Sequence, residues 1–172
     1  CGLSQNIEFK SSNFKTDKDG FKKAEDAIDK GDEYFELANA AFFEVKPLGL
    51  NYDLAAKQYA VAQKFNPNNA ELNLKIGICY GNGTYPEKCI PYIKKANELD
   101  PACDPFLPYY LGYAQQLEGD FSAATKSYEK FENEYKKADN FSKFVSQRKK
   151  ECKTGRDLIG APIRAWVDAV PE

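Results

Sequence analysis

Five cysteines are the side chains of this sequence most able to bind a metal ion or to form a covalent bond. They are Cys1, Cys79, Cys89, Cys103 and Cys152. No two of them have the Cys-x-x-Cys spacing typical of a zinc site, and the chain has no histidine to complete one. We therefore expect neither a metal site nor a bound cofactor.

The lack of histidine also argues against catalysis, because histidine is the commonest general base. No cysteine or serine stands beside another evident base that would activate it. The segment Gly81-Asn82-Gly83 resembles a phosphate-binding loop only in its glycines, since no Lys-Ser/Thr pair follows and no strand precedes it. We expect a protein that binds a partner and catalyses no reaction.

The cysteines after Cys1 have two interpretations each. Cys79 and Cys89 are either a disulfide or redox pair or two small apolar residues of the core, and the second interpretation is favoured because free cysteine packs well in cores. A bond between Cys103 and Cys152 stays open, because a sequence does not give the distance between them.

The charged residues exclude a nucleic-acid partner. The chain has 24 basic and 26 acidic residues, a net charge of −2, with no basic excess. Acidic residues crowd one predicted helix: Glu25, Asp26, Asp29, Asp32, Glu33 and Glu36. Lysines interrupt the cluster, so a solvated helix face is favoured over a site for a cation or a basic partner.

The elements that position these residues follow from a repeat of 34 residues. Pro67 and Pro101 each end an amphipathic segment after an apolar residue and Asn or Asp. Residues of matching size precede both prolines at three fixed distances. The matched pairs are Ala62 and Ala96, Tyr59 and Ile93, and Ala55 and Cys89. A third copy repeats Ile76-Gly77 as Leu111-Gly112 and turns at Gly119-Asp120.

This pattern resembles that of tetratricopeptide repeats. It predicts an all-α, right-handed solenoid of about three helix-turn-helix repeats, with a C-terminal capping helix after Asp139. Small residues (Ala38, Gly77 and Gly112) should let paired helices approach closely. Large residues (Tyr59, Ile93 and Tyr128) should pack against the next repeat.

The domain limits follow from changes in composition. Residues 1–16 are mostly polar and are predicted to be a flexible tether. Residues 17–159 form the repeat domain, in which about five extra residues at 46–50 should lengthen the first interhelical connection. Residues 160–172 are predicted to be a linker and the start of a following β domain, with a short strand at 163–167.

The concave groove of such a solenoid is lined by the first helix of each pair. The expected groove residues are Phe35, Asn39, Leu74, Ile78, Asn82, Phe106, Tyr109, Tyr113 and Gln116. Aromatic anchors and amide groups are suited to a protein or peptide partner. The alternatives are a groove filled by the chain's own ends and a surface without a ligand. The basic residues of a carboxylate clamp are missing, which disfavours chaperone C-terminal tails.

Residues 21–172 also resemble the N-terminal part of a family of Bacteroidetes outer-membrane lipoproteins, the OmpA-family, PorE-like components of the type IX secretion system. The resemblance lies in Ala70-Glu71-Leu72-Asn73-Leu74-Lys75-Ile76-Gly77, in Cys79-Tyr80, in Tyr109-Tyr110-Leu111-Gly112 and in the exit segment from Glu151-Cys152 to Pro162-Ile163-Arg164. It implies a scaffold at the periplasmic face of the outer membrane.

The same resemblance implies that Cys1, which precedes Gly2, carries the lipid anchor; the alternative is a fragment boundary at this position. Peptidoglycan would be bound only through domains absent from this chain. A second interpretation of the family resemblance is a structural spacer between the lipid anchor and a β-propeller or peptidoglycan-binding module.

Overall fold

The computed structural model describes residues 5–43, 49–135 and 140–155, and within these ranges the protein is all-α, without a strand. The helices are η1 (Ser11–Asn13), α1 (Lys18–Phe43), α2 (Gly49–Phe65), α3 (Ala70–Asn82), η2 (Pro86–Lys88), α4 (Cys89–Leu99), α5 (Leu107–Leu117), α6 (Phe121–Glu134) and α7 (Asn140–Lys153). The prediction of an all-α fold is confirmed. None of these helices is long and apolar enough to cross a membrane.

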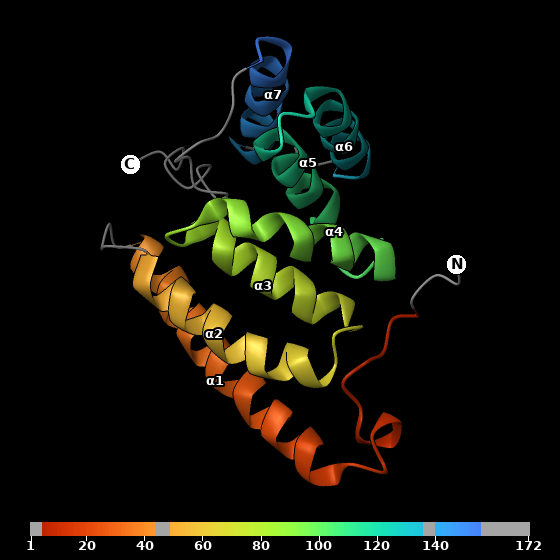
Figure 1. The fold of residues 1–172 in the computed structure, drawn as a ribbon. Coiled ribbons are helices and arrows are strands. Elements are labelled where there is room, and N and C mark those ends of the chain that lie inside the picture. Colours follow the sequence, from red (N-terminus) through yellow and green to blue (C-terminus); the bar gives the residue numbers. More distant parts are fainter. Residues whose placement is uncertain (1–4, 44–48, 136–139, 156–172) are drawn as a thin grey trace.

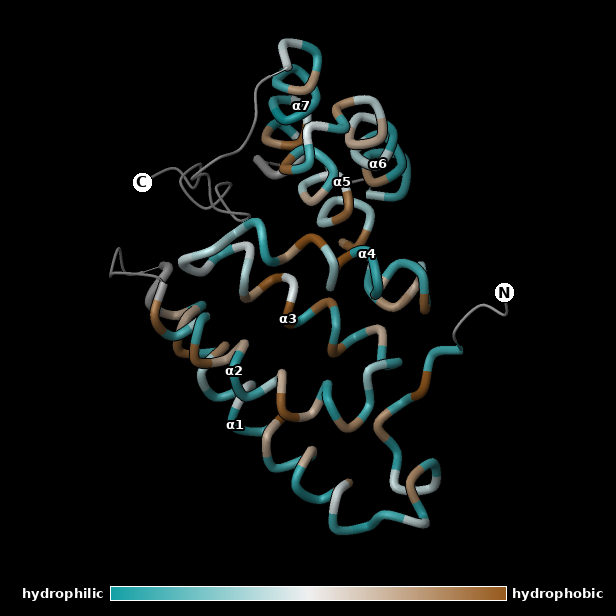
Figure 2. Tube along the Cα trace, viewed as in Figure 1, coloured by the Kyte–Doolittle hydropathy of each residue, from teal (hydrophilic) through white to brown (hydrophobic). Residues whose placement is uncertain are grey.

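The helices form a stack of antiparallel neighbours that runs from α1 to α7 (Figure 1). Each α-helix packs on the one before it and the one after it in the chain. Polar and apolar stretches alternate along the helices (Figure 2), as expected where only part of each helix surface is buried. The buried hydrophobic residues form two clusters, one from α1 to α3 and one from α3 to α7, and Phe35 and Tyr80 pack against both.

Local sequence signals set the helix ends. Helix α2 ends at Phe65 and α4 at Leu99, each two residues before a proline. Asn69 caps α3 by accepting a hydrogen bond from the Leu72 N–H at 2.7 Å. The turn before α6 contains Gly119 at φ +80°, a backbone angle that favours glycine.

Paired helices approach closely where a glycine faces a large side chain. A Cβ atom on Gly77 would lie 2.5 Å from Ile93, and one on Gly112 would lie 2.7 Å from the Tyr128 ring. We expected Ile93 and Tyr128 to pack against the next repeat, and the structure shows a contact of each within its own helix pair. They fill the space that a glycine leaves within their own helix pair.

The first pair differs from the other two in length. Gly31, not Ala38, faces the ring of Tyr59, at 2.5 Å from its added Cβ. Gly31 and Tyr59 are 28 residues apart, whereas Gly77 and Ile93 are 16 apart, as are Gly112 and Tyr128. The extra residues are thus not confined to 46–50. They extend α1 and α2 as helix, and α1 alone spans 26 residues.

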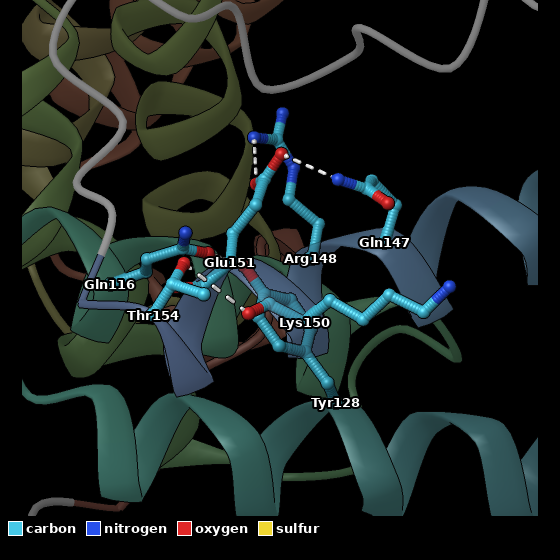
Figure 3. A network of polar contacts seen from close by, with 7 residues as sticks. All are labelled: Gln116, Tyr128, Gln147, Arg148, Lys150, Glu151 and Thr154. Carbon is cyan, nitrogen blue, oxygen red and sulfur yellow. Dashed lines mark hydrogen bonds and ion pairs between the residues drawn. The ribbon is translucent and has the colours of Figure 1, made fainter.

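Helix α7 closes the stack by packing on α6. Its residues Val145, Arg148 and Cys152 are buried. The Arg148 guanidinium bonds to Glu151 at 3.2 Å (Figure 3) and lies 4.5 Å from the Phe144 ring centre. The ion pair with Glu151 and the contact with the Phe144 ring explain why a charged residue is tolerated in this position.

Residues 5–14, called the N-terminal segment below, dock on the helices through the backbone of Ile7. The Ile7 N–H donates to the Asn68 carbonyl at 2.7 Å. The Ile7 carbonyl accepts from the side-chain amides of Asn66 at 2.8 Å and Asn69 at 3.0 Å.

Aromatic residues hold the rest of this segment. The Phe14 ring centre lies 4.9 Å from that of Phe65 and 5.6 Å from that of Phe21, and Phe9 joins the same cluster. A flexible tether over residues 1–16 stays a prediction, and residues 5–14 of it make these contacts with the helices. The polar composition of this segment does not indicate its three hydrogen bonds to the α2–α3 turn or its part in an aromatic cluster.

Substitution of Asn69 should separate its two roles. Asn69→Ala loses both the helix cap and the amide bond to Ile7, and is expected to lower the free energy of unfolding by about 2 kcal/mol. Asn69→Ser keeps a capping oxygen and lacks the amide donor to Ile7, so we expect about half that loss. Urea denaturation measures both. Equal losses in the two variants would show that the cap contributes little.

Three predictions concern residues that the structure does not describe. The lipidation of Cys1, the linker at 160–172 and the strand at 163–167 lie outside the described ranges. Cys79, Cys89, Cys103 and Cys152 are free thiols, so neither suggested disulfide is present.

Candidate binding cleft

An open cleft of about 460 Å³ lies where α1, α3 and α5 meet on one side of the stack. We call it the aromatic cleft. It is lined by Phe35, Glu71, Leu74, Lys75, Ile78, Cys103, Asp104, Phe106, Tyr109 and Tyr110. Its volume is within the range of small-ligand pockets and would admit one or two side chains of a peptide.

The wall of the aromatic cleft is held by the core behind it. Leu74, Ile78, Tyr109 and Tyr110 are buried members of the core cluster that joins α3 to α7. Phe106 packs its ring 5.4 Å from that of Phe131. Because these side chains are fixed by packing, the cleft is largely formed before any ligand arrives.

Lys75, which lines the cleft, belongs to a polar cluster with Asp32 of α1 and Tyr59 of α2. Asp32 Oδ1 accepts from the Tyr59 hydroxyl at 2.5 Å and from the Lys75 ammonium at 2.6 Å. The Lys75 Nζ also lies 5.5 Å from the Tyr59 ring centre. Burial and the Asp32 carboxylate raise the pKa of Tyr59, which keeps this phenol as the donor.

Two carboxylates lie at the opposite edge, where α3 and α5 begin. Glu71 is in the first turn of α3 and is exposed. Asp104 accepts a hydrogen bond from the Phe106 N–H at 2.6 Å. Both side chains line the cleft.

Cys103 lies beside these carboxylates. Burial, and then the charges of Asp100, Asp104 and Glu71, raise the pKa of its thiol to about 12. A thiol with such a pKa is almost wholly protonated at neutral pH and is a poor nucleophile. Cys103 therefore acts as a half-buried apolar lining residue, not as a reactive group.

A second hollow, of about 340 Å³, adjoins the cleft and shares Glu71, Lys75 and Cys103 with it. We call it the N-terminal hollow, because Asn6, Glu8, Phe9 and Lys10 form one of its walls. The chain's own segment thus borders the groove and leaves the aromatic cleft open.

Five of the nine predicted groove residues line the aromatic cleft: Phe35, Leu74, Ile78, Phe106 and Tyr109. The other four lie elsewhere. Asn39 accepts a hydrogen bond from the Tyr52 hydroxyl at 2.9 Å. Asn82 is buried and donates to the Ile78 carbonyl at 2.9 Å.

Tyr113 and Gln116 are fully buried, which corrects their assignment to the groove. The Tyr113 hydroxyl lies 3.4 Å from the Gly81 carbonyl, and Gln116 accepts from the Tyr128 hydroxyl at 3.0 Å. The reason is the central position of α5, which packs on both α4 and α6. Of α5, only Tyr109 and Tyr110 line the aromatic cleft.

Sequence reasoning missed Glu71, Lys75, Cys103, Asp104 and Tyr110. For α3 the signal was available, because Glu71, Lys75 and the predicted Leu74 and Ile78 follow one another at helical steps of three and four. Cys103 and Asp104 lie in the turn before α5, where helical periodicity does not show which way a side chain faces.

Comparison with models of known protein families gives no match, and no curated protein matches the chain in sequence. In the described part of the chain, no three His, Cys, Asp or Glu side chains are placed to hold a metal ion together.

Proposed function

We propose that this chain is a tetratricopeptide-type right-handed solenoid, with three helix pairs and α7 as its cap, that binds a protein or peptide partner in the aromatic cleft and catalyses no reaction. The observation that carries the proposal is the cleft itself. It is open, its wall is apolar and aromatic, and its side chains are held in place by the core. Such preformed apolar clefts favour binding because little order is lost on association.

The repeat assignment is supported by the recurring contact within the pairs. A glycine on the first helix faces a large residue on the second in all three pairs. Residues Ala55, Cys89 and Ala124 occupy matching positions on the second helices and are all fully buried. Stacked copies of one unit share a continuous core and leave a curved face for partners.

Selection of random 12-residue peptides on the immobilised chain tests the proposed function. Cys103→Trp should fill the cleft from the turn before α5, and Cys103→Ala is its matched control. We expect selected peptides to bind the natural chain and Cys103→Ala alike, and Cys103→Trp at least about tenfold more weakly. Circular dichroism checks that both variants fold. Enrichment of no peptide, or equal binding to Cys103→Trp, would contradict the proposal.

A second candidate function is a structural spacer, and the docked N-terminal segment favours it. This segment forms one wall of the N-terminal hollow and is bonded through Ile7 to the α2–α3 turn. A spacer predicts that no peptide is selected at all, so the same experiment separates the two candidates.

The proposed location is the periplasmic face of the outer membrane, in type IX secretion or envelope machinery. Its support is the residue pattern given above and the Cys1-Gly2 pair. Mass spectrometry of the N-terminal peptide from native membranes would test it, since an unmodified Cys1 contradicts lipid anchoring.

A further inference from the structure

Two carboxylates flank the mouth of the aromatic cleft, and their charges are not matched within the cleft lining. Of the charged side chains that line it, Glu71 and Asp104 are acidic and only Lys75 is basic. Lys75 is already held by Asp32 at 2.6 Å, on the α1 side. The edge where α3 and α5 begin is therefore negative.

The negative edge continues toward the N-terminal hollow. Asp100 lines that hollow together with Glu71 and Cys103. Within the hollow, Lys10 is paired with Glu8. A ligand that crosses from the aromatic cleft to the hollow would pass Asp104, Glu71 and Asp100.

Each carboxylate also has a structural reason for its position. Acidic groups are stabilised at the N-termini of helices, where Glu71 lies, and Asp104 accepts the Phe106 N–H. This role explains why the residues are acidic near a helix start. It does not explain why both side chains also line the open apolar cleft at this junction.

We propose that the partner is an extended peptide segment that inserts an apolar or aromatic side chain into the aromatic cleft and places a neighbouring Lys or Arg against Glu71 and Asp104. This inference rests on the proposed function. Apolar contact with Leu74, Ile78, Phe106 and Tyr109 supplies affinity, because burial of one large side chain is the strongest local contribution. The charge pair supplies specificity, because rim charges select partners more than they add affinity.

Paired charge-neutralising variants test the inference. Glu71→Gln and Asp104→Asn are combined, since the amide oxygen of the introduced asparagine can still accept the Phe106 N–H. Glu98→Gln combined with Glu129→Gln, two exposed carboxylates outside the cleft, is the control with the same charge change. The probe is the best peptide from the random selection, labelled with fluorescein, and its copy with every Lys and Arg replaced by Gln.

We expect selected peptides to be enriched in Lys or Arg within a few positions of an apolar residue. The Glu71→Gln/Asp104→Asn variant should bind the basic peptide about fivefold more weakly, and the control variant should bind it as the natural chain does. The peptide in which Gln replaces every Lys and Arg should bind both variants with the same affinity. Raising the salt concentration should weaken only the binding of the basic peptide.

The outcomes distinguish the inference from the proposed function. If the selected peptides lack Lys and Arg and still lose affinity for the Cys103→Trp variant, that result overturns the inference and leaves the proposed function in place. An unchanged affinity of the basic peptide for the neutralised variant does the same. If no selected peptide is sensitive to Cys103→Trp, the proposed function fails first.

Discussion

Replacement of Tyr128 with alanine is expected to lower the free energy of unfolding by about 4 kcal/mol. Tyr128 is fully buried, and its ring packs against Gly112 on the paired helix and lies 5.9 Å from the ring of Tyr109. Its hydroxyl donates to Gln116, which is also fully buried. The alanine variant therefore leaves a large cavity at the α5–α6 contact and removes a hydrogen bond in the same place. Urea denaturation followed by circular dichroism measures the loss.

Tyr128→Phe is the matched control for this cavity. It retains the ring and removes only the bond to Gln116, so we expect a loss of about 1 kcal/mol. A loss as large as that of Tyr128→Ala would mean that the polar contact, not the ring, determines the packing of α6. A loss below about 1 kcal/mol in the alanine variant would contradict the close glycine–tyrosine contact.

The positions of most helices could be predicted because the residues that end them act on the backbone locally. Pro67, Pro101 and Gly119 mark turns through backbone restrictions that act within one or two residues. The size pattern also succeeded in naming Gly77 and Gly112 as sites of close approach. These features depend on residues that are close in the sequence, so they can be recognised in a single sequence.

The length of the first pair could not be predicted from the same pattern. Gly31 and Ala38 are both small and lie two helical turns apart on α1, so either could face Tyr59. The choice depends on how far α1 and α2 continue before they turn, which is a property of the pair and not of either helix. The expected insertion of about five residues was therefore too short and was assigned to the connection alone.

The groove was predicted only in part for a related reason. Helical periodicity shows which residues of α5 share a face, but it does not show how many neighbours surround the helix. Tyr113 and Gln116 are buried because α4 and α6 both pack on α5. The docked N-terminal segment was missed because its bonds to Asn66 and Asn69 join residues about 60 positions apart.

A steep loss of stability is expected above pH 10, because buried phenols cannot ionise in the folded protein. Tyr59, Tyr113 and Tyr128 are fully buried, and burial is the main cause that raises the pKa of each. Below about pH 9 all three keep their protons in both the folded and the unfolded chain, so they add no pH dependence. Above pH 10 the unfolded chain releases protons that the folded chain retains, and unfolding becomes more favourable.

The expected slope follows from proton linkage. Each retained proton lowers the free energy of unfolding by about 1.4 kcal/mol per pH unit, so three phenols together give about 4 kcal/mol per pH unit. Burial also raises the pKa of the Cys89 and Cys103 thiols to about 12, so a smaller decline begins near pH 9. Urea denaturation between pH 7 and pH 11, at high salt to limit general charge repulsion, measures the slope. Tyr113→Phe removes one phenol and should reduce the slope above pH 10 by about 1.4 kcal/mol per pH unit, whereas an unchanged slope, or a flat profile to pH 11, would show that these rings reach solvent.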